Sequence, residues 1–82
     1  MYQIEHTQKS RKTLHKLKKD ARDRILIALD RLRIHPERRL KRLGNSPFYR
    51  FRVGDYRIII DFQKEVLIVL VIKIDHRKRI YD

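Results

Sequence analysis

The chain has 82 residues, enough for one domain with a single core over residues 1–82 and too few for two. It contains no cysteine, which excludes disulfides, thiolate metal sites and a cysteine nucleophile, and which fits a reducing, cytoplasmic location. Twenty-two Lys and Arg against ten Asp and Glu give a formal net charge of +12, so we expect a polyanion or an acidic protein as ligand. The longest apolar run, residues 66–72, is far shorter than the roughly 20 residues that span a bilayer, so we expect no membrane partner.

The first half of the chain predicts a strand followed by two helices. Residues 1–6 alternate between apolar and polar side chains, as a half-buried strand does. Thr7 is placed to cap a helix that runs to about Lys19. Asp20 is placed to cap a second helix, which ends just before Pro36. Because so few residues separate the two helices, they should form an αα-hairpin.

The second half predicts a small sheet. Residues 36–47 form a connection without clear periodicity, and three strands follow at about 48–53, 56–62 and 66–74. The last strand is apolar on both faces over residues 66–72, which predicts a central position in the sheet. The order β-α-α-β-β-β, with the helices segregated from the strands, predicts an α+β fold in which a sheet dominated by antiparallel pairs packs against the αα-hairpin.

Residues 49–57 carry the most informative pattern. Side chains alternate along a strand, so Arg50 and Arg52 share one face while the aromatic and aliphatic residues between them share the other. Gly54 fits the first central position of a two-residue type II′ turn, and this turn places Arg57 directly opposite Arg52. Like charges facing each other destabilise a ladder by roughly 0.2–1 kcal/mol. Three arginines on one face therefore indicate an anion site, the alternative being a solvated charged surface.

The C-terminal segment supplies further candidates. Arg77 adds a cation, and His76 is of the side-chain type that titrates near neutral pH. Tyr81 is a candidate base because neighbouring cations favour a tyrosinate. The alternatives are a structural His76 that closes the last strand and a Tyr81 ring packed on the sheet. The other histidines have no paired ligand spacing, so we expect neither a metal nor another cofactor.

Further basic residues lie on the first predicted helix and in the connection before the sheet. Their alternatives are a solvated surface and a set of contacts to RNA phosphates, which position a protein without reading sequence. The net charge favours the second. These residues are Lys9, Arg11, Lys12, Lys16, Arg38, Arg39, Lys41 and Arg42.

Over essentially its whole length the chain resembles the RelE/ParE superfamily of toxins from prokaryotic toxin–antitoxin pairs. The segments that carry the resemblance are the opening Tyr2-Gln3-Ile4, the αα-hairpin, Leu40-Lys41-Arg42-Leu43-Gly44, the Arg-Val-Gly-Asp-Tyr-Arg hairpin at 52–57 and His76-Arg77…Ile80-Tyr81. RelE-like toxins are ribosome-dependent endoribonucleases that cut messenger RNA in the A site, whereas ParE-like toxins block DNA gyrase without nuclease activity. The resemblance to RelE implies a microbial RNase fold, a metal-independent endoribonuclease, and three partners: ribosome, messenger RNA and a RelB-like antitoxin. The antitoxin should present an acidic segment and form a heterodimer or heterotetramer with the toxin.

The resemblance also implies the site. Arg50 and Arg52 stand where the bacterial RelE pattern has lysines, and Arg77 and Tyr81 are closer together than in that pattern. Cleavage would use the ribose 2′-hydroxyl and leave a 2′,3′-cyclic phosphate, with arginines stabilising the charge that builds on the phosphate. Tyr81 is the expected base and His76 its rival, as base or as acid. By position the RelE catalytic residues fall on Arg50, Arg52, Arg57, Arg77 and Tyr81.

Overall fold

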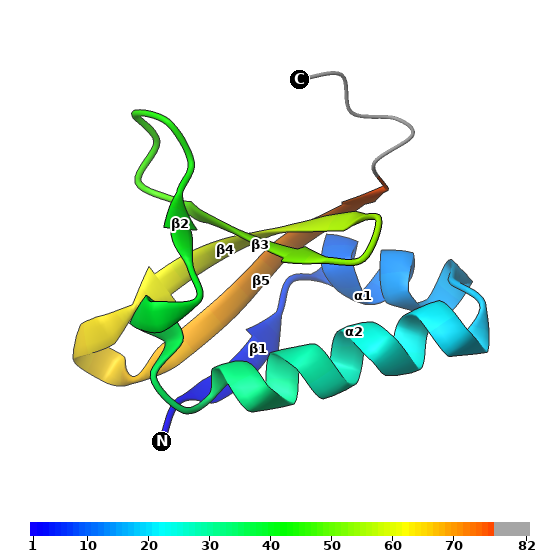
Figure 1. The fold of residues 1–82 in the computed structure, drawn as a ribbon, viewed down its shortest axis with the longest axis horizontal. Helices are drawn as coiled ribbons and strands as arrows, with labels where there is room; N and C mark the ends of the chain where they lie inside the picture. The colour runs from blue at the N-terminus through cyan, green and yellow to red at the C-terminus, as the bar shows by residue number, and fades with distance from the viewer. Residues whose placement is uncertain (77–82) are drawn as a thin grey trace.

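The computed structural model describes residues 1–76 and contains two α-helices and one five-stranded sheet (Figure 1). The strand order is β1-β5-β4-β3-β2, with β1 parallel to β5 and the other neighbours antiparallel. The predicted α+β fold and the dominance of antiparallel pairs are confirmed. In chain order the elements are β1 Gln3–His6, α1 Gln8–Lys16, α2 Lys19–Leu32, the 3-10 helix η1 Pro36–Arg38, β2 Lys41–Arg42, β3 Tyr49–Val53, β4 Tyr56–Gln63, the 3-10 helix η2 Lys64–Val66 and β5 Ile68–His76.

Helix α1 begins where the sequence predicts. Thr7 is its N-cap, and the Thr7 hydroxyl accepts a hydrogen bond from the backbone N–H of Ser10 at 3.2 Å. The helix ends at Lys16, earlier than the predicted Lys19, because Leu17 has extended backbone angles (φ −74°, ψ 152°). The short link that follows joins α1 directly to α2, so the predicted two-helix pair is present.

The predicted cap of helix α2 is wrong. Lys18, not Asp20, occupies the N-cap position, and it makes no side-chain capping bond. Asp20 lies inside the first turn, where its negative charge still interacts favourably with the helix dipole. The helix ends at Leu32, and His35 adopts a left-handed conformation (φ 53°) immediately before Pro36.

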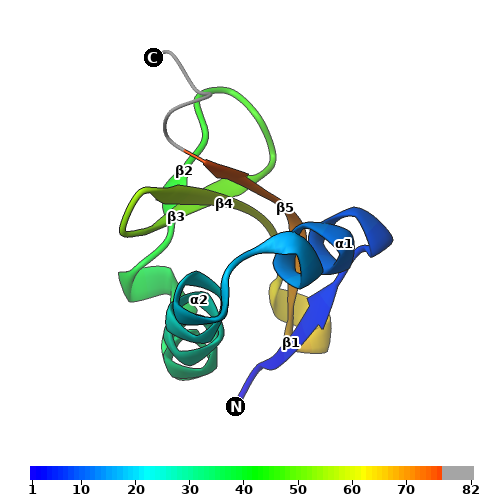
Figure 2. The ribbon, with the colours of Figure 1, turned by 90° about the vertical axis from the view of Figure 1, so that its right-hand side faces the viewer.

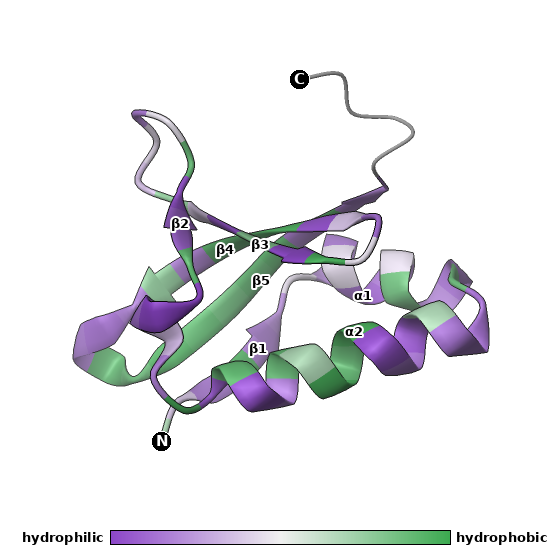
Figure 3. Cartoon of the chain, viewed as in Figure 1, coloured by the Kyte–Doolittle hydropathy of each residue, from purple (hydrophilic) through white to green (hydrophobic). Residues whose placement is uncertain are grey.

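One hydrophobic core lies between the sheet and the helices. Figure 2 shows the sheet curving over α2, with α1 beside β5. In Figure 3 the apolar positions concentrate on β4, β5 and α2, while α1 and β2 are largely hydrophilic. Neither α-helix covers the outer face of the sheet, meaning the face turned away from α1 and α2 (Figures 1 and 2). Fully buried core residues include Ile25, Leu29, Leu32, Ile58, Ile60, Val69 and Val71.

Two features of the sheet differ from the sequence prediction. The connection at 36–47 contains the short edge strand β2, which pairs with the start of β3. Strand β5 lies between β1 and β4, the central position that was predicted, but it starts at Ile68 rather than Val66. Between β4 and β5 the chain forms η2, and Leu67 then reverses its direction at φ 58°.

Strand β5 contains a β-bulge that the sequence analysis did not predict. Ile59 of β4 pairs with Lys73 of β5, whereas the next residue, Ile60, pairs with Val71. Ile72 is therefore one extra residue on β5, and such an insertion reverses which face of the sheet the following side chains occupy.

The bulge changes the phase of β5 and is held by Thr7, the N-cap residue of α1. Val71, before the bulge, is buried in the core, and the next buried residue after the bulge is Ile74. The two are three positions apart, whereas residues on one face of a regular strand are two apart. The backbone N–H of Thr7 donates to the Val71 carbonyl at 3.0 Å, and the Thr7 hydroxyl donates to the Ile72 carbonyl. Because of this change of phase, Asp75 occupies the outer face of the sheet.

Candidate nucleic-acid interface

The β3–β4 hairpin has the predicted register. Arg52 is paired directly with Arg57, so two guanidiniums project from neighbouring strands on the same face. Of the two turn residues, Gly54 has a positive φ of 57° and Asp55 does not, which is the pattern of a type II′ turn. The turn therefore fixes the register that brings the like charges together.

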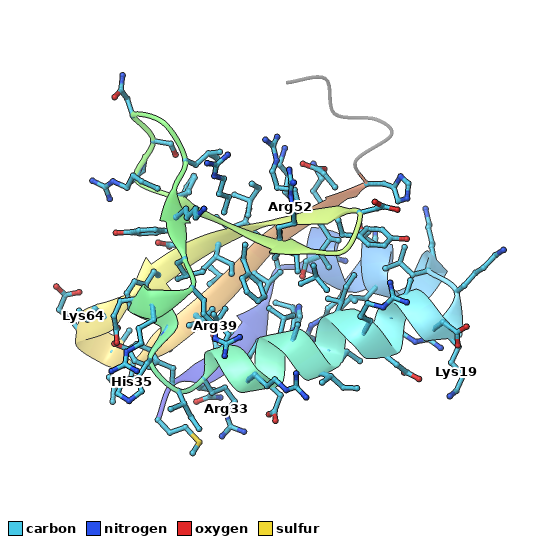
Figure 4. The ribbon with its side chains drawn as sticks, in the orientation of Figure 1. Lys19, Arg33, His35, Arg39, Arg52 and Lys64 are labelled. Carbon is cyan, nitrogen blue, oxygen red and sulfur yellow. The ribbon has the colours of Figure 1, made fainter. Side chains whose placement is uncertain are left out.

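Residues paired across the strands form two rows on the outer face of the sheet, which we call the cationic face. Partners directly opposite each other have Cβ atoms about 4.5–5.5 Å apart, so the members of a row are neighbours. Figure 4 shows Arg52 on the side of the sheet away from α2. The first row is Arg52 of β3, Arg57 of β4 and Asp75 of β5. The second row is Lys41 of β2, Arg50 of β3, Ile59 of β4 and Lys73 of β5.

The cationic face has an apolar floor. Ile59 is only 3% exposed although neither α-helix covers it, so the side chains around it shield it from water. Electrostatic interactions strengthen where water is excluded, so the half-buried Arg57 and Lys73 beside this floor act more strongly on a ligand than the exposed Arg50 and Arg52.

A hollow of about 340 Å³ opens beside the cationic face. Apart from Phe51 its lining residues are arginines and one lysine, and guanidiniums bind phosphate oxygens in a bidentate fork. A second hollow of about 270 Å³, between β1 and α2, is lined by both acidic and basic side chains and gathers no such set of cations. The larger hollow therefore suits a phosphate group; its lining is Arg39, Lys41, Arg50, Phe51, Arg52 and Arg57.

Of the candidates predicted in the C-terminal segment, the structure describes His76. His76 pairs with Tyr56 and lies on the core side of the sheet, where its ring meets the Tyr56 ring edge-on at 4.8 Å. It is thus on the opposite face from Arg57. Arg77 and Tyr81 lie outside the described residues.

The remaining basic residues lie in different parts of the structure. Arg39 and Lys41 join the hollow beside the cationic face. Arg42 instead sits 5.4 Å from the centre of the Tyr49 ring, and its Nη1 donates to the Tyr49 hydroxyl at 3.2 Å. Arg38 is exposed at the end of η1. The predicted RNA-binding residues of α1 are exposed as well, on the helix layer; they are Lys9, Arg11, Lys12 and Lys16.

The sequence analysis did not single out Lys73 of the cationic face, nor the acidic residue of its first row, Asp75. Its Oδ2 lies 3.3 Å from Nζ of Lys73, and it is paired with Arg57 in the ladder. Regular alternation along β5 would place Asp75 on the same face as the buried Val71. Because of the bulge, Asp75 lies on the outer face instead. A charged residue at an apparently buried strand position was the available signal.

Within residues 1–76, no group of three or more acidic or histidine side chains is arranged to hold a metal ion. No helix in that part of the chain combines the length and the apolar character needed to cross a membrane.

The family described as the ParE toxin of the type II toxin–antitoxin system, parDE, matches residues 4–81. The chain belongs to this toxin family. The predicted membership of the RelE/ParE superfamily is thus confirmed, and the protein is a type II toxin by family. A comparison with curated protein sequences finds no match.

Solved structures similar to this ParE-family toxin are those of RelE proteins. One is the RelBE2 toxin–antitoxin complex from Mycobacterium tuberculosis, with 28% identity and a TM-score of 0.81 over 93% of this chain and 98% of that one. Another is the archaeal RelE–RelB complex from Pyrococcus horikoshii, with 27% identity and a TM-score of 0.80 over 96% and 98%. The intact E. coli RelBE complex, at 21% identity and a TM-score of 0.80 over 93% and 96%, shares the fold.

Proposed function

We propose that this toxin is a metal-independent endoribonuclease that cuts messenger RNA in the ribosomal A site and so inhibits translation. The observation that carries the proposal is the cationic face, where five Lys and Arg side chains from four strands surround the buried Ile59. Like charges paired across strands destabilise the sheet, and a bound anion would offset this repulsion. The arrangement is therefore the one expected of a site that binds an anion.

The chemistry follows from what guanidiniums do. In the proposed reaction the 2′ oxygen bonds to phosphorus as the bond to the 5′ oxygen breaks. The 2′-hydroxyl loses a proton, the 5′ oxygen gains one, and the products are a 2′,3′-cyclic phosphate and a 5′-hydroxyl. Negative charge builds on the non-bridging oxygens, so a guanidinium fixed beside them lowers the barrier.

Within this proposal the arginines divide the work. Arg57 is half-buried in the middle of its row and is the best placed to stabilise the reacting phosphate, with Arg77 as its partner. Arg50 and Arg52 are exposed and suit gripping the neighbouring backbone. We assign the base to Tyr81, since His76 faces Tyr56 on the other side of the sheet.

We further propose that a cognate antitoxin controls the toxin. The similar structures from Mycobacterium tuberculosis and Pyrococcus horikoshii are toxin–antitoxin complexes, which supports a partner of this class. An acidic antitoxin segment would neutralise the cationic face, in a heterodimer or heterotetramer. The exposed cations of α1 would contact ribosomal RNA.

The test is to incubate the toxin with translating ribosomes and to map new 5′ ends on the message. Wild type should produce ends in the A-site codon, and Arg57→Ala should lower the cleavage rate by about 10²-fold or more, as loss of one oxyanion-stabilising donor does. The matched control is Arg31→Ala, which removes the same charge from the exposed surface of α2 and should cut at the wild-type rate. Ribosome binding by wild type without new ends would refute the nuclease.

The second candidate is a DNA gyrase inhibitor without catalysis, which the match to the ParE family favours. It predicts that Arg57→Ala and Tyr81→Phe keep their toxicity in growing cells. It also predicts that the toxin inhibits supercoiling by purified gyrase. The two functions are thus separated by one pair of variants and one assay.

A further inference from the structure

The cationic face contains a carboxylate to which the proposed reaction gives no role. Asp75 is paired with Arg57 across β4 and β5, and its Oδ2 lies 3.3 Å from Nζ of Lys73. Its side chain is 29% exposed, so it is held close to the surface of the sheet. Lys73 is therefore already ion-paired with an anion, and Arg57 has the same anion as its cross-strand neighbour.

A carboxylate in this position opposes the binding of nucleic acid in two ways. It repels the negative charge of an approaching phosphate, and it interacts with the N–H donors that the phosphate needs. The bulge at Ile72 places Asp75 on this face, and the Thr7 hydroxyl holds the Ile72 carbonyl. Asp75 is thus fixed there by the backbone.

We propose that Asp75 is a built-in competitor for phosphate, a specificity-determining residue that nucleic acid must displace from Arg57 and Lys73. A ligand with a single phosphate contact gains too little binding free energy to displace Asp75. A nucleic-acid strand that places several phosphates along the cationic face gains enough. The residue therefore raises the binding threshold for stray anions. This inference rests on the proposed use of the cationic face for phosphate, but not on the cleavage step.

The experiment measures binding of a fluorescent single-stranded oligodeoxynucleotide by anisotropy, because DNA lacks the 2′-hydroxyl and stays uncut. Asp75→Asn should bind about three- to tenfold more tightly at low salt, since the repelling charge beside Arg57 is gone and Lys73 is released from its ion pair. The plot of log K against log salt should steepen by about 0.7, the value for one more phosphate contact on a single strand.

The matched control is Asp61→Asn. Asp61 lies on the same outer face and the variant makes the same change in net charge, but Asp61 is paired with Leu70 and accepts from the Gln63 side chain at 2.8 Å. It should tighten binding less than about twofold, through long-range charge alone. If Asp75→Asn binds no more tightly than Asp61→Asn, the proposal is wrong.

Two further variants show whether the effect runs through the carboxylate and Arg57. Asp75→Glu keeps the charge and should bind within about twofold of wild type, since the ion pair with Lys73 and the negative charge beside Arg57 are retained; binding as tight as that of Asp75→Asn would overturn the proposal. In the Arg57→Ala background Asp75→Asn should lose most of its gain, and an undiminished gain would contradict displacement from Arg57. If Arg57→Ala alone leaves binding unchanged, the phosphate site, and with it the proposed function, is wrong instead.

Discussion

The facing arginines of the β3–β4 hairpin predict a toxin that becomes more stable when part of its site is removed. Arg52 and Arg57 are directly paired, and the variant Arg52→Gln keeps a long polar side chain while it removes one charge. Two unit charges about 6 Å apart in water repel by about 0.7 kcal/mol. Asp75 on the other side of Arg57 offsets part of this, so we expect a gain of about 0.5 kcal/mol, within the usual cross-strand range.

The assay is thermal unfolding at low and high salt, with oligonucleotide binding measured in parallel. For a domain of this size about 0.5 kcal/mol raises Tm by roughly 2–4 °C. The gain should vanish near 1 M salt, where the screening length falls to about 3 Å, while binding is weakened at low salt. The control is Arg42→Gln, which loses the Tyr49 contact and should unfold at a lower temperature. A lower Tm for Arg52→Gln at low salt, or a gain that ignores salt, would refute the reasoning.

Two more predictions concern pH and the backbone. Burial first, and then the charge of Arg11, lower the pKa of His6, whose Nδ1 lies 3.0 Å from the Ser10 hydroxyl. The unfolded chain therefore takes up this proton more readily, so stability contributed by neutral His6 is complete above about pH 6.5 and is lost as the pH falls below it. His6→Gln should show a smaller drop in Tm between pH 7.5 and 5 than wild type, and an equal drop would contradict this. Gly54→Ala and Gly44→Ala place a side chain at φ 57° and 54°, which should cost about 1 kcal/mol each in denaturant unfolding; a stabilised variant would show that these turns rearrange.

The hairpin was predictable because every local signal agreed. Arg50 and Arg52 alternate with buried residues, and Gly54 accepts only a few turn types, so the pairing of Arg52 with Arg57 followed without the rest of the fold. Strand β2 was missed because its two residues, Lys41 and Arg42, are both exposed and have no periodicity. Its existence depends on a partner, β3, that lies several residues further along the chain.

The part of the cationic face that β5 contributes, Lys73 and Asp75, could not be predicted from the sequence for a different reason. The phase of β5 depends on Ile72, and nothing in an unbroken apolar run marks the residue at which a strand bulges. The Thr7 hydroxyl that holds the Ile72 carbonyl comes from the other end of the chain. Sequence analysis consequently considered His76 as a rival base and overlooked Asp75.

Because the bulge places Lys73 and Asp75 on the outer face, these two residues also fix the register of β5 in the sheet. If β5 slid by one residue and lost the bulge, these two side chains would turn into the apolar core, and burying unsatisfied charges costs several kcal/mol. The apolar residues Ile68 to Ile72 would tolerate such a slide far better, because both sides of that segment are hydrophobic. The charged pair that borders the site thus excludes the misaligned sheet, and a substitution made there to tune ligand binding also tests how uniquely the chain folds.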